Sequence, residues 1–142
     1  MGHPATKAFL ERVKAAEQKF KERKSAMPEL PPLTREISTR INVMCPPSTY
    51  RLITYLWENN GARSDEISAR VAIGNVSDAA SRPAARDAQQ ELGLAIMCEV
   101  CPSINRYGQS GSIGRWWLSV TDMNKLYPEP ANDSEYAIQD EA

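Results

Sequence analysis

An apolar stripe at helical spacing begins the central part of the chain, in residues 48–60. It consists of Leu52, Ile53, Leu56 and Trp57. Pro46-Pro47 precedes the stripe, and Ser48 is a residue type that caps helix starts by accepting a hydrogen bond from a backbone N–H. Asn60-Gly61 follows it as a stop signal. The pattern predicts a helix that begins at Ser48 and buries one face.

A second, shorter helix is predicted to begin at Ser64, with acidic residues in its first turn, where the helix dipole favours negative charge. Ile67 and Val71 repeat at the spacing of one helical face, and Gly74-Asn75 is a stop signal. We expect a loop at residues 75–80, between this helix and the next one.

The start of the third helix depends on Pro83. A proline inside a helix removes a backbone hydrogen bond and clashes with the preceding turn, which costs about 3 kcal/mol. A proline in the first turn avoids this cost, because the N–H groups there have no partner in the helix. We therefore expect Ser81 to cap a helix over residues 82–92 that Gly93 ends. Its inward face carries Ala85, Ala88 and Leu92.

A β-hairpin is predicted after the third helix. Residues 94–101 and 115–120 are expected to be its strands, and residues 102–114 form a polar, glycine-rich connection. The Trp116-Trp117 pair points to opposite faces of the second strand, so one ring belongs to the core and the other packs against the N-terminal helix or a partner. A helix, a helix-turn-helix and a hairpin in this order predict an α+β winged helix-turn-helix domain over residues 48–120.

The chain before this domain predicts an N-terminal helical extension and a linker. Residues 1–27 form a basic amphipathic helix with a thin apolar seam. The seam consists of Phe9, Val13, Ala16, Phe20 and Met27. This helix could pack one edge on the body, form a short coiled-coil dimer arm, or lie along DNA. Residues 28–47 begin as a proline-rich linker, and the ISTRINV segment alternates as a short strand does.

The chain after the domain is acidic. Residues 121–142 contain six Asp/Glu and one lysine. We expect a short helix at 122–127, capped by Thr121, and disorder beyond Pro128.

Charge is distributed unevenly along the chain, although the formal net charge is only -1. Residues 1–27 hold seven Lys/Arg and three Glu, whereas residues 48–120 hold seven arginines, seven Asp/Glu and no lysine. Every positive side chain of the central domain can therefore make bidentate contacts to phosphate or guanine.

The cysteines and the histidine argue against metal binding and catalysis. Cys98 and Cys101 form a CxxC motif, but a structural zinc site has four ligands, and only Cys45 and His3 could be added. On a strand Cys98 and Cys101 also point to opposite faces. A single histidine leaves no nucleophile–base arrangement in the body. We therefore predict no metal, no cofactor and no enzymatic activity.

No apolar run approaches the roughly 20 residues that span a bilayer, and the N-terminus has no apolar signal core. We expect a cytoplasmic protein, associated with the nucleoid if it binds DNA, with no membrane contact and no small-molecule ligand.

The third predicted helix carries the candidate base contacts, because the N-terminal part of the second helix of a helix-turn-helix enters the major groove. Arg82 and Arg86 are four residues apart and share one face. Gln89 could bind adenine if it faces outward. Ser81, with the N–H groups beside it, is suited to holding a phosphate.

Residues 81–88, Ser-Arg-Pro-Ala-Ala-Arg-Asp-Ala, and the Leu-Gly-Leu exit at 92–94 resemble a known recognition helix. The resemblance is to the gluconate-repressor type of winged-helix transcription regulators, whose pattern is Ser-Arg-Pro-Thr-Val-Arg-Glu-Ala-Leu. It implies that Arg82 and Arg86 contact DNA, and that a wing with an Arg-Gly element, similar to Gly114-Arg115, reaches the minor groove.

Further DNA contacts are expected at helix starts and on the wing. The candidates for phosphate contacts at helix starts are Ser48, Thr49, Arg63 and Ser64. The candidates on the wing are Asn105, Arg106, Tyr107 and Arg115. Because Arg106 and Tyr107 interrupt a glycine-serine tip, we favour a phosphate or minor-groove contact by Arg106 over a solvated hairpin tip.

The sequence thus predicts a sequence-specific double-stranded DNA-binding protein, a small homodimeric transcriptional regulator such as a repressor. Helix 82–92 would read the major groove, and residues 102–114 would contact the flank. The alternative, from a different class, is a winged-helix adaptor that binds another protein, because residues 48–120 lack a basic excess. Affinity for DNA that falls steeply with salt would distinguish the two.

Overall fold

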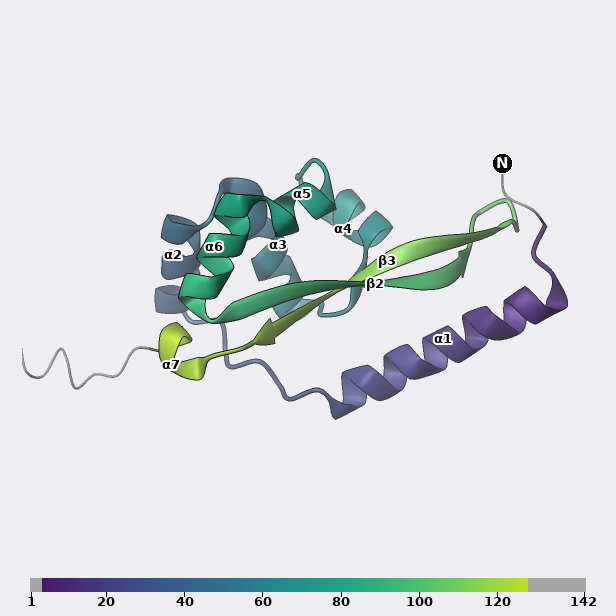
Figure 1. Cartoon of the computed structure of the whole chain (residues 1–142), viewed down its shortest axis with the longest axis horizontal. Helices are drawn as coiled ribbons and strands as arrows, with labels where there is room; N and C mark the ends of the chain where they lie inside the picture. Colours follow the sequence, from purple (N-terminus) through teal and green to yellow (C-terminus); the bar gives the residue numbers. More distant parts are fainter. Residues whose placement is uncertain (1–3, 128–142) are drawn as a thin grey trace, which may run out of the picture.

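The computed structural model describes residues 4–127, which form an α+β fold (Figure 1). Within this range the helices are α1 (Lys7–Ala26), α2 (Arg35–Met44), α3 (Pro47–Glu58), α4 (Ser64–Arg70), α5 (Val76–Ser81), α6 (Pro83–Leu92) and α7 (Met123–Leu126). The strands are β1 (Ala62–Arg63), β2 (Leu94–Ile104) and β3 (Ser110–Val120), and they form an antiparallel sheet in the order β1-β3-β2. None of the described helices is long and apolar enough to cross a membrane.

Helices α2 to α6 lie on one side of the sheet and enclose the main core (Figure 1). The predicted stripe of α3 is confirmed, because Leu52, Ile53, Leu56 and Trp57 are all buried. The predicted inward face of α6 is confirmed as well, because Ala85, Ala88 and Leu92 are buried. The periodicity of apolar residues was therefore sufficient to place these two helices.

The short strand expected from the ISTRINV segment is wrong, because this segment is part of α2. Thr34 caps the helix by accepting a hydrogen bond from the backbone N–H of Ile37 at 3.3 Å. Ile37 and Ile41, one turn apart, are both buried, whereas Val43 is 78% exposed. Their burial follows the spacing of one helical face and not the alternation of a strand.

The loop expected at residues 75–80 is also wrong, because α5 occupies most of it. Asn75 caps α5 by accepting a hydrogen bond from the N–H of Asp78 at 3.2 Å, and Val76 is buried in the core. Arg82 then takes an extended ψ of 148°, as expected for a residue before proline. Pro83 lies in the first turn of α6, as predicted, although the helix begins at Pro83 itself and not at Arg82. The proline therefore divides one longer helical region into α5 and α6.

Gly93 ends α6 in the left-handed conformation with φ of 68°, as predicted. A Cβ atom at this position would lie 2.3 Å from the carbonyl oxygen of Asp122. Asp122, not Thr121 as expected, caps α7 by accepting a hydrogen bond from the N–H of Asn124 at 3.0 Å. The disorder expected beyond Pro128 lies outside the described residues.

The β2–β3 hairpin is longer than predicted and extends beyond the helical layer (Figure 1). Its register runs without interruption from Leu94 opposite Val120 to Ile104 opposite Ser110. The connection is therefore limited to residues 105–109, instead of 102–114. Pairing across the strands keeps the polar Gly-Ser segment extended, although its composition is typical of a loop.

Helix α1 lies along the hairpin on the side opposite α2 to α6 (Figure 1). Its N-terminal end is tied to the hairpin connection, because the N–H of Ala5 donates to the carbonyl of Gly108 at 3.1 Å. Near its other end, the Phe20 ring lies 5.4 Å from the Trp117 ring, measured between centroids. Of the three alternatives open for this helix, the structure shows the one in which it packs one edge on the body.

Candidate nucleic-acid interface

The two arginines predicted to read bases are both exposed at the corner between α5 and α6. Arg82 is both the C-cap of α5 and the N-cap of α6, and its side chain is 68% exposed. Its Nη2 atom lies 3.5 Å from Oδ2 of Asp78, one turn earlier. Arg86 lies one turn into α6 and is exposed. The corner therefore presents two guanidinium groups within two turns of the chain.

Ser81 does not cap α6, contrary to the prediction. It is the last residue of α5, and its hydroxyl donates a hydrogen bond to the carbonyl of Ser77 at 2.5 Å. The reason is that Pro83 occupies the first helical position, which makes Arg82 the capping residue. The Arg82 side chain makes no capping hydrogen bond.

Gln89 does not face outward, so the adenine contact predicted for it is wrong. The residue is only 6% exposed. Its Nε2 donates to the carbonyl of Ala80 at 2.7 Å, and its Oε1 accepts from the N–H of Ile96 at 3.2 Å. Both polar groups of the amide are thus used inside the protein, where they join the end of α5 to the edge of β2.

The phosphate contact predicted for Thr49 is wrong for the same kind of reason. Pro46 is the capping residue of α3, so Ser48 is not the cap and Thr49 falls on the buried face, where it is 1% exposed. The Thr49 hydroxyl donates to the carbonyl of Ala79 at 2.6 Å. Thr49 therefore connects α3 to α5, and Ser48 stays half-buried in the first turn of α3.

At the start of α4, Arg63 forms an ion pair with Asp65. Its Nε and Nη2 atoms donate to the two carboxylate oxygens of Asp65 at 3.2 and 2.9 Å. The Ser64 hydroxyl accepts a hydrogen bond from Nε1 of Trp116 at 2.8 Å and donates to the carbonyl of Gly114 at 3.3 Å. The phosphate-binding role predicted for Ser64 is wrong, because its hydroxyl is committed to the hairpin.

The hairpin connection is built around Asn105, with Arg106 and Tyr107 at its tip. The Asn105 side-chain oxygen accepts from the N–H groups of Tyr107 and Gln109 at 2.9 and 3.0 Å. Asn105 therefore shapes the turn. The Arg106 guanidinium lies 5.1 Å from the centre of the Tyr107 ring, and this ring is 71% exposed. These two side chains are the ones that the tip offers to a ligand.

Arg115 lies away from the tip, contrary to the wing contact predicted for it. It pairs with Glu99 across the strands, and its Nη1 donates to the carbonyl of Gly61 at 3.0 Å. Its guanidinium also lies 3.8 Å from the centre of the Phe20 ring of α1. Because the strands extend further than the sequence indicated, this residue falls in the middle of the hairpin and under α1.

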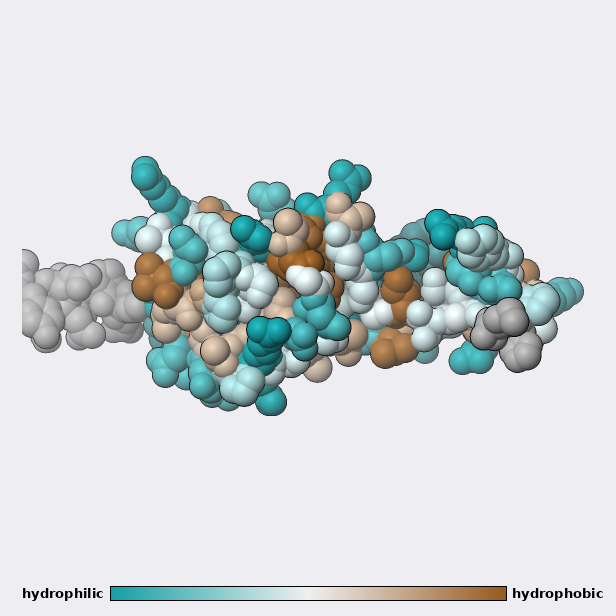
Figure 2. All heavy atoms as spheres, turned by 90° about the horizontal axis from the view of Figure 1, so that it is seen from above, coloured by the Kyte–Doolittle hydropathy of each residue, from teal (hydrophilic) through white to brown (hydrophobic). Residues whose placement is uncertain are grey.

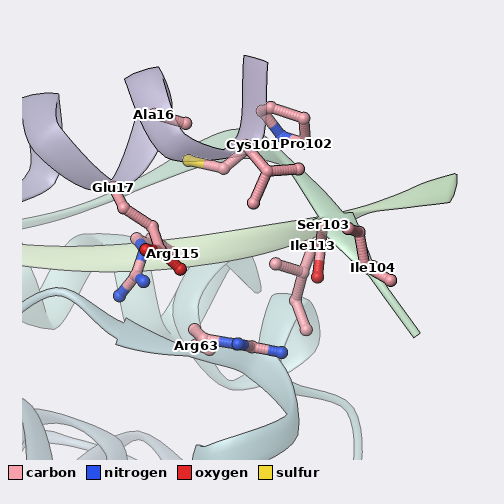
Figure 3. Close-up of a pocket in the computed structure, with 10 residues that line it drawn as sticks. Ala16, Glu17, Arg63, Cys101, Pro102, Ser103, Ile104, Ile113 and Arg115 are labelled. Carbon is pink, nitrogen blue, oxygen red and sulfur yellow. The ribbon is translucent and has the colours of Figure 1, made fainter. Parts of the chain in front are cut away.

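Figure 3 shows a hollow between α1 and the hairpin, whose lining includes Glu17, Arg63 and Arg115. Its volume is about 250 Å³. Both guanidinium groups have protein partners, Asp65 for Arg63 and the Gly61 carbonyl for Arg115. The Cys101 thiol also lines the hollow, and its pKa is raised by burial and by the hydrogen bond and charge of Glu99. Because the thiol stays protonated and both arginines have protein partners, we interpret this hollow as part of the packing between α1 and the hairpin.

The CxxC cysteines point to opposite sides of β2, as predicted. Cys98 is exposed, and its sulfur lies on the side of Gly114 and Ser64, whereas Cys101 is buried toward α1. Burial, followed by the charge of Glu99, raises the pKa of the Cys98 thiol, and burial raises that of Cys45 to about 11. Among residues 4–127 no three His, Cys, Asp or Glu side chains gather as metal ligands would.

Figure 2 looks onto the side of the molecule that carries α4 and α5. The surface there is largely hydrophilic, with several small apolar areas, one of them in its middle. The connection between α4 and α5 contributes the half-buried Val71 and Ile73. The candidate interface therefore combines exposed polar groups with a limited apolar area.

Comparisons of the chain with protein families, with curated proteins and with solved structures found no match.

Proposed function

We propose that this protein is a winged-helix protein that binds double-stranded DNA and regulates transcription, for example as a homodimeric repressor. The order of elements supports this proposal, because α3, β1, α4, the α5–α6 pair and the β2–β3 hairpin follow the succession of a winged helix. In this arrangement α4 and α5–α6 are the helix-turn-helix, and the hairpin is the wing.

The observation that carries the proposal is the exposure of Arg82 and Arg86 at the start of α6. In a helix-turn-helix this part of the second helix enters the major groove, where arginine binds the O6 and N7 atoms of guanine. The first N–H groups of α6 have no acceptor within the helix and can donate to a phosphate. The resemblance of residues 81–88 to the gluconate-repressor type of recognition helix supports the same docking mode.

Asp78 has a specific part in this proposal. Its carboxylate lies 3.5 Å from the Arg82 guanidinium and holds it near the corner of α5 and α6 before DNA binds. On binding, Arg82 exchanges this exposed ion pair, which contributes about 1 kcal/mol or less, for a bidentate contact to a base. Arg86 makes no ion pair within the described residues, so it is available without such an exchange.

At the other end of the interface, Arg106 and Tyr107 would contact the DNA flank. An arginine at the tip of a hairpin can bind a phosphate or enter the minor groove. Such a contact adds affinity that depends little on base sequence.

The test is selection of bound sequences from a random duplex library, followed by affinity measurements on the selected and on random DNA. Arg82→Ala and Arg86→Ala are each expected to cost about 1–3 kcal/mol on the selected sequence and much less on random DNA. Arg106→Ala should weaken binding to both and lower the salt dependence by about one phosphate contact. Arg35→Ala, an exposed arginine at the start of α2, is the matched control and should change neither.

Equal losses on selected and random DNA for Arg82→Ala and Arg86→Ala would contradict base reading. Absence of binding to any duplex at low salt would favour the second candidate function, an adaptor that binds protein. The pairing of Arg63 with Asp65 and of Arg82 with Asp78 favours that candidate, because it reduces the positive charge available to DNA.

A further inference from the structure

β2 is an edge strand, and half of its backbone groups point away from the sheet. In the register with β3, odd-numbered residues of β2 lie opposite odd-numbered residues of β3. The N–H of Leu118 donates to Asn60, on the β1 side, so the even-numbered residues of β3 point away from β2. On β2, the N–H of Ile96 donates to Gln89, outside the sheet. The even-numbered residues of β2 therefore direct their N–H and carbonyl groups to the free edge.

This free edge is closed at both ends. The N–H of Ile96 is taken by the Gln89 side chain at 3.2 Å. Pro102, at the other end, has no N–H to donate. Between them, Cys98 and Val100 direct their N–H groups outward, and neither has an acceptor within residues 4–127. The available edge is therefore a short segment, residues 97–101.

The side chains of this segment are unusually apolar for an exposed edge. Val100 is 72% exposed and Met97 is 60% exposed. Proteins protect edges that must stay unpaired with charged residues, especially lysine. Residues 97–101 contain no lysine, and their one charged residue, Glu99, is paired with Arg23 of the same chain. A groove of about 390 Å³ runs beside the segment, between β2 and α1. Its lining combines apolar side chains, such as Ala15, Ala16 and Val100, with the charged Arg12, Lys19 and Glu99.

We infer that this edge is a homodimer interface, in which residues 97–101 of two copies pair as antiparallel strands. An antiparallel pair of identical segments is related by a two-fold axis, so each copy satisfies the other with the same groups. The inference goes beyond DNA binding and does not depend on it.

One register pairs both free N–H groups of each copy. With Cys98 opposite Val100 of the second copy, each of these residues exchanges an N–H and a carbonyl with the other, which makes four hydrogen bonds. With Cys98 opposite Cys98, the carbonyl of Val100 would face the N–H of Ile96, which Gln89 already holds. With Val100 opposite Val100, the carbonyl of Cys98 would face Pro102, which has no N–H.

The side chains fit this register on both sides of the joined sheet. Val100 comes opposite Cys98 of the second copy on one side, which pairs two exposed groups of low polarity. On the other side, Met97 comes opposite Cys101 of the second copy, beside the groove between its β2 and α1. Glu99 comes opposite Glu99, and Arg23 of the same chain, 2.6 Å away, neutralises each carboxylate.

The first experiment measures the mass of the full chain by sedimentation velocity over a range of concentrations. Val100→Lys places a charge in the centre of the edge and should weaken the dimer at least about tenfold. Val43→Lys is the matched control, because Val43 is 78% exposed on α2, away from the edge. It should dimerise like the unchanged protein. Far-UV circular dichroism establishes that both variants are folded.

The second experiment uses Cys98 as a marker of the register. Cys98 is the exposed cysteine, whereas Cys45 and Cys101 are buried. The register places the two Cys98 Cα atoms roughly 8 Å apart, from the strand spacing and an offset of two residues. A short bis-maleimide should therefore link two chains, and Cys98→Ser should prevent the link while the protein still dimerises.

A monomer at all concentrations would overturn the inference and would favour a strand of a different protein as the partner of this edge. A dimer that is equally stable in Val100→Lys and Val43→Lys would overturn it as well, as would a dimer in which Cys98 is never linked.

Discussion

The two neighbouring tryptophans of β3 lie in different environments. Trp116 faces the helical layer and belongs to the main core, where its Nε1 donates to the Ser64 hydroxyl at 2.8 Å. Trp117 faces α1, where Phe20 lies 5.4 Å from its ring and the Arg23 guanidinium 4.2 Å from the ring centre. The Nε1 of Trp117 is buried and has no hydrogen-bond partner within the described residues. Both rings are buried, but only that of Trp116 is held by a hydrogen bond within the described residues.

The difference lies in what covers each ring. The helices above Trp116 share many fully buried residues, including Leu52, Ile67 and Leu92 at 0% exposure. Helix α1, which covers Trp117, has no buried residue in its twenty positions. Segments with few buried apolar contacts open locally at low free energy, whereas core segments open only when the whole domain unfolds. We therefore expect α1 to detach from the hairpin while the helical layer stays folded.

The largest effect should follow from removing the ring on the helical side. Trp116→Ala leaves a large cavity and takes away the hydrogen-bond donor of Ser64, so it should lower the free energy of unfolding by about 3–5 kcal/mol. Urea denaturation, followed by circular dichroism, measures this change. Tyr107→Ala, at an aromatic residue that is 71% exposed, is the control and should have little effect. A loss below about 1 kcal/mol for Trp116→Ala would place Trp116 outside the cooperative core.

The sequence was sufficient to predict the elements that depend on local chemistry. The stripe of α3, the place of Pro83 in the first turn of α6 and the end of α6 at Gly93 follow from periodicity and from the backbone limits of proline and glycine. The opposite faces of Trp116 and Trp117 follow from the alternation of a strand. α5 was missed because Pro83 marks the start of a helix, and a loop is expected before such a start, although the residues there form a helix of their own.

The partners of polar side chains could not be predicted in the same way. Thr49, Gln89 and Ser64 are residue types that bind phosphates or bases, yet each makes hydrogen bonds to another element of the protein. Those elements approach only in the folded chain, and the sequence does not show which polar groups they bring. Arg82 and Arg86 lie outside the predicted inward face of their helix, and both are exposed. Their contact with DNA stays a prediction.

On the α1 side, Phe20→Ala should have a smaller and more local effect than Trp116→Ala. Phe20 is half-buried, so removing its ring should cost about 1–2 kcal/mol, which reflects partial burial and the contact with Trp117. Hydrogen exchange should accelerate in α1 and stay unchanged in α3, and the Trp117 fluorescence should shift to longer wavelength. Leu10→Ala is the control, because Leu10 is 41% exposed on the same helix. Equal acceleration in α1 and α3 would show that α1 unfolds only with the whole domain.

The smallest effect should come from the ion pair at the edge of the α1 contact. Nη1 of Arg23 lies 2.6 Å from Oε2 of Glu99, with the two side chains 39% and 50% exposed. Exposed pairs of this kind contribute about 0–1 kcal/mol and are weakened by salt. Glu99→Gln should therefore accelerate hydrogen exchange in α1 slightly at low salt and hardly at all at high salt.

Glu11→Gln, which removes the same charge from the exposed surface of α1, separates the ion pair from the general effect of one negative charge. It should not accelerate exchange in α1 at either salt concentration, because Glu11 makes no ion pair within residues 4–127. If Glu99→Gln and Glu11→Gln behave alike, the Arg23 guanidinium holds α1 through its contact with the Trp117 ring and not through the carboxylate. If high salt leaves the effect of Glu99→Gln unchanged, the hydrogen bond itself, and not charge attraction, fastens this end of α1.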